Sequence, residues 1–409
     1  MYTISNVLIG ALPSVRTDKV KTDKVKSDYD PAAVLLELIR GEIASRGPIS
    51  FARFMELALY HPGLGYYERS VGQIGRHGDY FTNVSVGSLF GDLLAFDFAR
   101  RLTNLRSGKP VIVECGAHDG TLANDILTRL QIQQPGLYEK LQYVIVEPSH
   151  SRRRVQTRTL SRHSHKVTWR PTISEKNSSW INGVIFSNEL LDSFPFHRLK
   201  WNASDCEWHE EGVGLENNRL VWVDLGPWRQ ARGSSFTDDN CNPAMGCSTI
   251  LLETESAADF LPDGFRLDYC PAATRWWQTA ARSLAVGALV TIDYGFTCEE
   301  LLCTSRSGGT ARAYHRHSVD DALLDLPGQK DITAHVDFSA LIEQGEAEGL
   351  ETEFFGPQEL YIMRILRNTH ESDPGFARWT DQQYRQLTTL VHPCQMGRVF
   401  RVLSQVRPC

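Results

Sequence analysis

Residues 111–122, with the sequence VIVECGAHDGTL, constrain the fold of this chain more than any other stretch. An apolar strand leads into an acid, Glu114, and then into a turn that contains Gly116 and Gly120. Apolar residues recur after the turn at helical spacing, at Leu122, Ile126, Leu127 and Leu130. A strand, a glycine-rich turn and an amphipathic helix in this order predict a doubly wound α/β domain that binds a ligand close to the backbone of the turn.

A second apolar strand is predicted at residues 141–147, and it ends in the carboxylate of Glu147. In a doubly wound fold, an acid at this place accepts hydrogen bonds from the ribose hydroxyls of an adenosine cofactor. The predicted cofactor-binding residues of the two strands are Glu114, Gly116, Ala117, Gly120 and Glu147. The alternative is an ordinary strand, turn and helix that binds no ligand.

The acid at the end of the first strand indicates which adenosine cofactor the site can bind, because the candidate cofactors differ in charge. Glu114 would repel the pyrophosphate of NAD or FAD, and it would attract the ammonium of S-adenosylmethionine, which carries no phosphate. The third glycine of the dinucleotide pattern is also missing from the turn. The sequence therefore favours S-adenosylmethionine, and an NAD-linked oxidoreductase is the alternative.

The overall charge and the cysteine pattern exclude other classes. The 409 residues are 42% hydrophobic and carry a formal net charge of −6, which argues against binding dominated by nucleic-acid phosphates. The nine cysteines include no CxxC pair, so we expect neither a disulfide framework nor a metal site. A basic run after the second strand is interpreted as a solvated outer helix; it contains Arg152, Arg153, Arg154, Arg158, Arg162 and Lys166.

The N-terminal residues and the hydropathy bear on location. No apolar stretch reaches the roughly 20 residues that cross a bilayer, so we expect no membrane insertion. Residues 1–30 are predicted to be a disordered tail, in which lysines alternate with aspartates, unlike an acid-poor mitochondrial presequence. These features predict a cytoplasmic protein.

The pattern of helices and strands predicts the domain organisation. A helical cap at 31–105 has helices beginning near Pro31 and Ser50 and a glycine-rich loop at 63–80. Residues 197–284 are predicted to be an insertion with a β-hairpin and a mobile loop.

The core is predicted at 106–196 and 285–409. Its expected strands are 111–115, 142–147, 167–170, 183–187 and 288–295, with 311–314 and 399–403 as edge strands.

Several segments in order resemble the MidA-like class I methyltransferases, which include a mitochondrial protein arginine methyltransferase. The matching segments are Gly47 to Pro62, Gly65 to Tyr67, Gly78 to Thr82, Glu114 to Leu122, Ser187 to Pro195, Asp293 to Gly295 and Asp331 to Phe338. The resemblance implies a Rossmann-like methyltransferase sheet with S-adenosyl-L-methionine as cofactor. It also implies that Asp79 and Thr82 lie on a lid over the methionine end of the cofactor.

Two departures from the family pattern bear on the site. His118 stands where the family usually has a glycine, so its side chain must point away from the cofactor or contact it. Val84 and Ser85 stand where the family has proline and glutamate near the substrate entrance. The second departure leaves the substrate class open.

Three residues after the strand at 183–187 are predicted to act on the acceptor. Methyl transfer is an in-line displacement, so the protein mainly positions an unprotonated nucleophile. A guanidinium acceptor must be held by carboxylates and must lose a proton. We predict that Glu189 orients the acceptor and takes this proton, that Asp192 is a second acceptor, and that Asn188 lines the methyl-transfer channel. The alternative is that Glu189 or Asp192 caps a helix after the strand.

The predicted function is methylation of a protein side chain, with arginine as the specific acceptor. The alternatives are a non-catalytic assembly factor or chaperone that binds S-adenosylmethionine, and a small-molecule O- or N-methyltransferase. We expect a protein substrate, no nucleic-acid partner and no metal, and the oligomeric state stays open.

Overall fold

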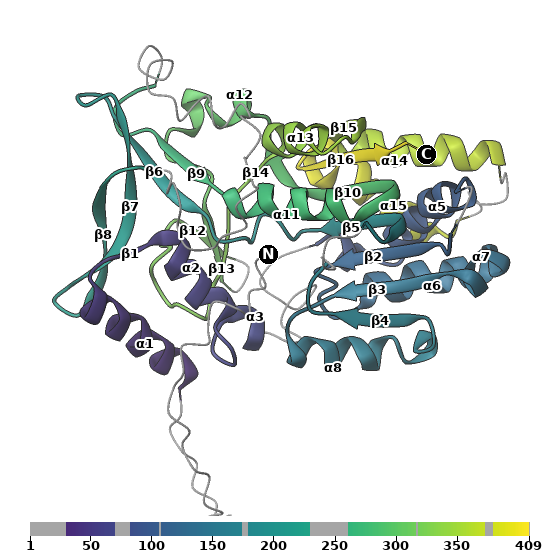
Figure 1. Cartoon of the computed structure of the whole chain (residues 1–409), viewed down its shortest axis with the longest axis horizontal. Helices are drawn as coiled ribbons and strands as arrows, with labels where there is room; N and C mark the ends of the chain where they lie inside the picture. The colour runs from purple at the N-terminus through teal and green to yellow at the C-terminus, as the bar shows by residue number, and fades with distance from the viewer. Residues whose placement is uncertain are drawn as a thin grey trace, which may run out of the picture.

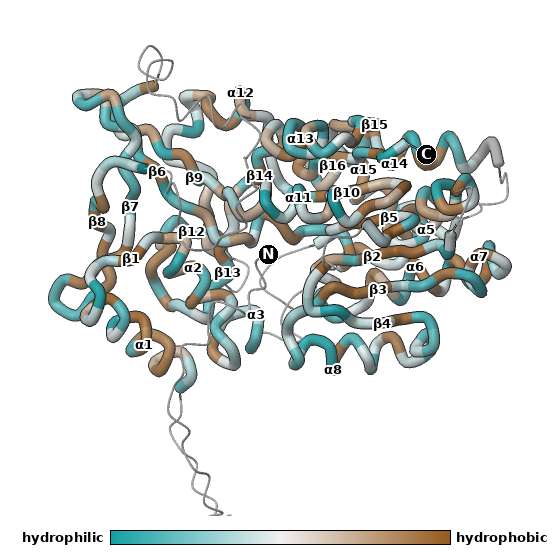
Figure 2. Tube along the Cα trace, viewed as in Figure 1, coloured by the Kyte–Doolittle hydropathy of each residue, from teal (hydrophilic) through white to brown (hydrophobic). Residues whose placement is uncertain are grey.

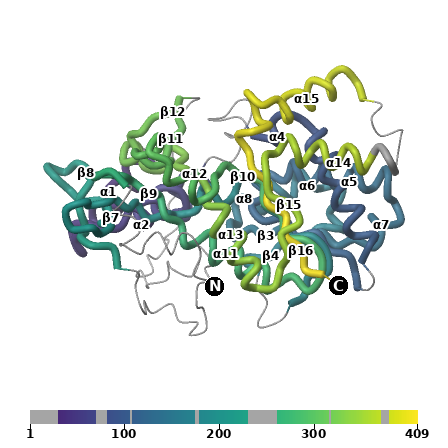
Figure 3. The backbone as a smooth tube through the Cα atoms, turned by 90° about the horizontal axis from the view of Figure 1, so that it is seen from above, coloured from purple at the N-terminus to yellow at the C-terminus, as the bar shows by residue number. Residues whose placement is uncertain are grey.

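The computed structural model describes residues 30–69, 82–105, 108–173, 179–229, 261–315, 318–372 and 379–408. These residues form two lobes that lie side by side (Figure 1). The larger lobe is a mixed α/β unit, and the smaller lobe is built mainly from antiparallel strands (Figures 1 and 3). The tail predicted at 1–30, except for residue 30, lies outside the described residues, as do residues 70–80 of the glycine-rich loop and most of the loop predicted as mobile.

The larger lobe contains the strands β2 (Val111–Cys115), β3 (Gln142–Val146), β4 (Val167–Arg170), β5 (Ile181–Asn188), β10 (Leu284–Phe296), β14 (Val336–Asp337), β15 (Glu351–Pro357) and β16 (Phe400–Arg407). Their order in the eight-stranded sheet is β15-β16-β10-β5-β2-β3-β4, with β14 paired to β10. The strands from β10 to β4 are parallel, whereas β16 is antiparallel to both of its neighbours.

The predicted doubly wound α/β fold class and its five core strands are confirmed. All five residues of β2 are buried, as expected for a parallel strand that is covered on both faces. Figure 2 shows the hydrophobic character of β2 and β3. The strand predicted at 399–403 is also confirmed as β16, but the true edge strand next to it, β15, was not predicted.

Helices cover both faces of this sheet (Figure 1). They are α4 (Asn83–Val86), α5 (Leu89–Thr103), α6 (Thr121–Gln133), α7 (Pro135–Lys140), α8 (His150–Thr159), α11 (Pro271–Ser283), α12 (Cys298–Leu301), α13 (Phe338–Ala347), α14 (Gln358–Ser372) and α15 (Asp381–Val391). Apolar residues of α5, α6 and α14 form one core with the sheet, and those of α11 and α13 form another.

The smaller lobe contains α1 (Pro31–Arg46), β1 (Ile49–Ser50), α2 (Phe51–Tyr60), α3 (Tyr66–Arg69), β6 (His197–Asn202), β7 (Glu207–Glu216), β8 (Arg219–Pro227) and β9 (Arg266–Tyr269). The two predicted helix starts are confirmed, because Asp30 and Ser50 accept hydrogen bonds from the first turns of α1 and α2.

The predicted β-hairpin is confirmed as β7 and β8, and it belongs to a five-stranded sheet with β1, β6 and β9. Trp201 and Trp208 are buried together in one apolar cluster, whereas Trp222 is 38% exposed. The segment predicted as an insertion therefore supplies most of the smaller sheet. The domain boundaries themselves stay a prediction.

The prediction that 311–314 is an edge strand of the core sheet is wrong. These residues belong to β11 (Arg312–His315), which pairs with β12 (Ser318–Asp320) and β13 (Asp331–Thr333) in a separate sheet. The reason is packing, because Ala311 and Ala313 are buried in the apolar cluster that contains Phe51 and Phe54 of α2.

Candidate functional site

The predicted cofactor turn lies between β2 and α6. Gly116 and Gly120 have φ angles of 76° and 86°, which side chains rarely adopt. A Cβ atom on Gly116 would lie 2.8 Å from Cδ1 of Leu190. The turn is closed by a hydrogen bond of 2.7 Å from the Gly120 amide to the carbonyl of Ala117, which is buried. The turn therefore needs glycine at both positions for backbone reasons, and Gly116 also needs it for the close approach of Leu190.

The side chain of His118 lies beside its neighbour in the turn. Nδ1 of His118 is 3.7 Å from Oδ1 of Asp119, and the imidazole is 32% exposed. Burial alone would raise the pKa of Asp119, but the neighbouring His118 and the hydrogen bond from Thr121 lower it to about 2. His118, which stands where the family usually has a glycine, thus lies beside the acid Asp119 within the turn.

Glu147 lies at the end of β3, next to the end of β2, where Cys115 pairs with Val146. Its side chain is 5% exposed. One carboxylate oxygen accepts from the amide of Ser149 at 2.9 Å, and the other accepts from Nε2 of Gln156 at 3.1 Å. Burial raises its pKa. Each carboxylate oxygen can accept a second hydrogen bond, so the acid is oriented and retains acceptor capacity.

Glu114 is buried inside β2 and accepts a hydrogen bond of 2.7 Å from the hydroxyl of Tyr143. Burial raises the pKa of Glu114 to about 8, so the carboxyl binds a proton at neutral pH when no cation is near. A bound ammonium would favour its charged form. The negative charge that the sequence predicts at Glu114 therefore depends on a bound ammonium.

Glu189 follows β5 with a φ of 51°, which is uncommon for a residue with a side chain. Its Oε1 accepts from the amide of Asn83 and from Nδ2 of Asn188, each at 3.0 Å. Its Oε2 is buried and has no hydrogen-bond partner among the described residues. Burial raises the pKa of Glu189 to about 8. The carboxylate is held at one oxygen and open at the other.

Asp192 and Asp293 lie close to Glu189. Oδ2 of Asp293 accepts from the amides of Leu190 and Leu191, which fixes the turn after β5. Burial raises the pKa of Asp293 to about 7. Burial also raises the pKa of Asp192, and the neighbouring acids, Asp293 first, raise it further. Neither Glu189 nor Asp192 caps a helix, because residues 189–196 form turns and irregular structure.

We refer to Glu189, Asp192 and Asp293 as the acid cluster. Within the described ranges, none of the three forms an ion pair with a lysine, arginine or histidine. Buried acids without a cation are costly to fold and are typical of functional sites. The described residues contain no group of three or more His, Cys, Asp or Glu that could hold a metal ion.

Several residues that contact this region were not predicted. Asn83 is fully buried and donates from its side chain to Oδ1 of Asn188 at 3.4 Å. It also accepts from Nε2 of Gln358 at 3.0 Å. Asp331 is buried in β13, accepts from the hydroxyl of Tyr67 at 2.6 Å, and adds to the charge that raises the pKa of Asp192.

Weak signals for these residues are present in the sequence. Asp331 lies in a segment that resembles the family, and Asn83 directly follows the predicted lid residue Thr82.

The predicted lid residues are only partly described. Asp79 lies outside the described residues. Thr82 caps α4, where its hydroxyl accepts from the amide of Ser85 at 3.1 Å, and Oγ of Ser85 donates back to the Thr82 carbonyl. Because Asn83 is bonded to Glu189, the start of α4 lies directly over the acid cluster.

The fold and this edge of the sheet define the class of protein, and comparisons with known proteins agree. The family described as "Putative S-adenosyl-L-methionine-dependent methyltransferase" matches residues 93–356. The chain belongs to this methyltransferase family. It is an S-adenosylmethionine-dependent methyltransferase of the MidA-like type, as the sequence resemblance implied.

Individual relatives are similar over most of the chain. A Drosophila melanogaster protein named "Protein arginine methyltransferase NDUFAF7 homolog, mitochondrial" is 25% identical over 90% of this chain and 84% of its own length. The Homo sapiens protein named "Protein arginine methyltransferase NDUFAF7, mitochondrial" is 24% identical over 96% of this chain and 88% of its own length.

A solved structure gives the fold independently. It is a "likely methyl transferase from Burkholderia thailandensis bound to S-adenosyl-homocysteine", with a TM-score of 0.76, 29% identity and 92% of each chain covered.

The predicted cytoplasmic location is contradicted, because the relatives from both animals are named as mitochondrial proteins. The alternation of lysine and aspartate near the N-terminus was therefore a poor guide to location. Among the described helices, none is long and apolar enough to span a membrane.

Proposed function

We propose that this methyltransferase modifies a protein side chain and that the acceptor is the guanidinium of an arginine. The proposal rests mainly on the acid cluster, which presents buried carboxylates with no partner cation among the described residues. A guanidinium is a planar cation with five N–H donors, and carboxylates bind it through paired hydrogen bonds. The cluster therefore has the charge and the acceptors that such a side chain needs.

Glu189 has the central role in this proposal. S-adenosylmethionine supplies an electrophilic methyl group on its sulfonium. When the new nitrogen–carbon bond forms and the carbon–sulfur bond breaks, the acceptor nitrogen must lose one proton. A bound guanidinium favours the charged form of Glu189, and its open Oε2 then takes this proton while Asn83 and Asn188 hold Oε1 in place. Asp192 binds the far side of the cation and keeps it oriented.

The cofactor residues form the second part of the proposal. We propose that the turn of Gly116, Ala117 and Gly120 contacts the cofactor, that Glu147 accepts from its ribose, and that Glu114 faces its ammonium. Support comes from the φ angles of the two glycines and from the oriented carboxylate of Glu147 at the neighbouring strand end. Thr82 acts through the start of α4, which it caps.

The names of the relatives support arginine as the acceptor, since both animal proteins described above are named protein arginine methyltransferases. The identities of 24–25% are too low to transfer the substrate by themselves. An experiment must identify the methylated group.

The test is product analysis. The purified protein is incubated with radiolabelled S-adenosylmethionine and an extract of cells that lack it, and the labelled protein fraction is hydrolysed to amino acids. We expect label in methylarginine. Label only in small molecules would favour the small-molecule methyltransferase. Binding of S-adenosylhomocysteine without any transfer would favour the non-catalytic assembly factor.

A further inference from the structure

Arg152 differs from the other arginines of the basic run. It lies in the first turn of α8 and is 9% exposed, whereas Arg154 and Arg158 on the same helix are exposed. The interpretation of the run as a solvated outer helix is therefore wrong for Arg152. A buried arginine needs partners, because removing its charge from water is costly.

The partners of Arg152 in the described residues do not satisfy it. Its Nε donates to the carbonyl of Tyr67 at 3.0 Å, and its guanidinium carbon lies 5.3 Å from the centre of the Tyr67 ring. Its Nη2 is buried and has no hydrogen-bond partner among the described residues. Arg152 takes part in no ion pair among the described residues, although its charge opposes the rise in the pKa of Glu147. The side chain is thus anchored at one nitrogen and open at another.

The position of Arg152 on α8 places it at the cofactor edge of the sheet. Gln156, one helical turn further along, lies on the same face of the helix. It donates to Glu147 at 3.1 Å and to the carbonyl of His118 at 3.0 Å, so this face of α8 packs on the cofactor turn. Arg152 lies one turn nearer the helix start, toward the carboxyl ends of the strands, where ligands bind in open α/β sheets.

We propose that Arg152 binds the α-carboxylate of S-adenosylmethionine. The α-carboxylate is the one anionic group of this cofactor, and a planar guanidinium is the side chain best suited to bind it. In this arrangement Tyr67 holds the guanidinium in place, and the opposite charges of the amino-acid end are bound by Arg152 and Glu114. The inference concerns cofactor binding alone and is independent of the acceptor.

Calorimetry with two ligands tests the proposal. S-adenosylhomocysteine carries the carboxylate, whereas 5′-methylthioadenosine has the same adenosine and thioether and lacks the amino-acid end. For Arg152→Gln we expect S-adenosylhomocysteine to bind about tenfold more weakly or worse, with 5′-methylthioadenosine within about twofold of the wild type. Arg154→Gln, an exposed arginine of the same helix, is the matched control and should leave both affinities unchanged.

Two outcomes would overturn the proposal. One is an unchanged affinity of Arg152→Gln for S-adenosylhomocysteine. The other is an equal loss for both ligands, which would mean that Arg152 acts on the ribose or on the fold. Arg152→Lys provides a second variant that keeps the charge and loses the planar fork. It should weaken S-adenosylhomocysteine selectively but by less than Arg152→Gln does.

Discussion

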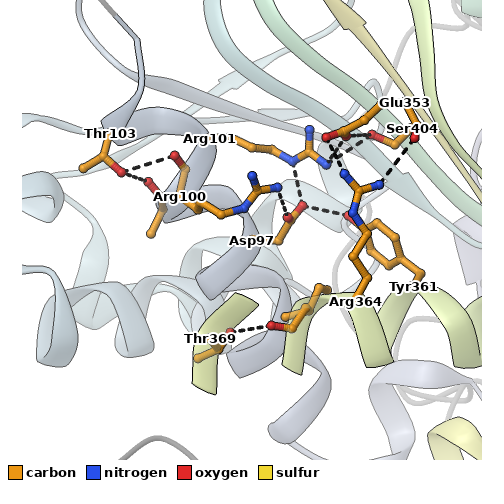
Figure 4. Close-up of polar contacts among 11 residues, drawn as sticks. Asp97, Arg100, Arg101, Thr103, Glu353, Tyr361, Arg364, Thr369 and Ser404 are labelled. Carbon is orange, nitrogen blue, oxygen red and sulfur yellow. Dashed lines mark hydrogen bonds and ion pairs between the residues drawn. The ribbon is translucent and has the colours of Figure 1, made fainter. Parts of the chain in front are cut away.

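The larger lobe contains two groups of buried acids. In one group the acids are paired with arginines, and in the other they have no partner cation among the described residues. The first, which we call the paired network, joins α5, α14, β15 and β16 (Figure 4). In it Nε of Arg101 lies 2.6 Å from Oδ2 of Asp97, and Nη2 of Arg101 lies 2.7 Å from Oε2 of Glu353. Tyr361 donates to Asp97 at 2.8 Å. Burial raises the pKa values of Asp97 and Glu353, but Arg101 outweighs it and holds both below their ordinary values.

In the acid cluster, by contrast, burial raises the pKa values of all three acids, and no described cation opposes it. The same fold therefore neutralises one set of buried acids and leaves another set open. The paired network has the composition expected of a structural contact between elements. The acid cluster has the composition expected of a site whose cation arrives with the substrate.

The largest expected effect comes from breaking the paired network. Arg101→Leu leaves Asp97 and Glu353 without their main cation, and we expect a loss of about 3–5 kcal/mol in the free energy of unfolding. Urea denaturation measures this. A loss below about 1 kcal/mol would mean that the network does not hold these elements together.

Removing an acid from the acid cluster should increase the free energy of unfolding, whereas breaking the paired network should decrease it. Asp192→Asn removes a buried carboxyl whose raised pKa costs stability at neutral pH, so we expect a gain of about 1 kcal/mol in the free energy of unfolding, together with a loss of methyl transfer. The same urea denaturation, paired with a labelling assay, checks both. A destabilised variant would indicate that Asp192 has a structural partner and not a substrate role.

The pH dependence of stability should report the acid cluster. The pKa of Glu189 is raised from 4.5 to about 8 and that of Asp293 from 3.8 to about 7. Their stabilising contribution is therefore full below the unfolded values and is lost as pH rises through 7 and 8. We expect the melting temperature to fall between pH 5.5 and pH 8.5, and to fall less in Glu189→Gln.

The paired network should change stability at lower pH and in the opposite direction, so that stability falls as the pH falls. The pKa values of Asp97 and Glu353 are lowered, so their contribution is present at neutral pH and is lost as pH falls below about 4. A melting temperature that rises steadily from pH 5.5 to pH 8.5 would contradict the contrast between the two groups.

The smallest expected effect is at the rim of the paired network. Arg100 also contacts Asp97, at 3.0 Å, but its side chain is 40% exposed. We expect Arg100→Ala to cost less than about 1 kcal/mol, because water screens exposed ion pairs. A cost as large as that of Arg101→Leu would show that exposure does not separate the two arginines.

The sequence predicted the parts of the fold that depend on local patterns. β2 and β3 are continuous apolar runs, and the turn at Gly116 and Gly120 needs glycine for backbone reasons. The acids after β5 lie at the carboxyl end of a parallel strand, a common place for a site, and their role stays a prediction.

Contacts between distant residues could not be predicted in this way. Asn83 reaches Glu189 across 106 residues, and Tyr67 reaches Asp331 across 264. The burial of Arg152 depends on which face of α8 meets α3, a contact between segments far apart in the sequence. The strand at 311–314 was assigned to the wrong sheet for the same reason, since its pairing depends on packing against α2.

The most direct test of the central claim is methyl transfer by Glu189→Gln, measured with radiolabelled S-adenosylmethionine beside calorimetry with S-adenosylhomocysteine. Glu353→Gln, an acid of the paired network, is the control and should retain transfer below its melting temperature. We predict that Glu189→Gln transfers methyl at least about 100-fold more slowly while S-adenosylhomocysteine binds within about twofold of the wild type. Unchanged transfer by Glu189→Gln would contradict the claim that the open acid cluster receives the acceptor.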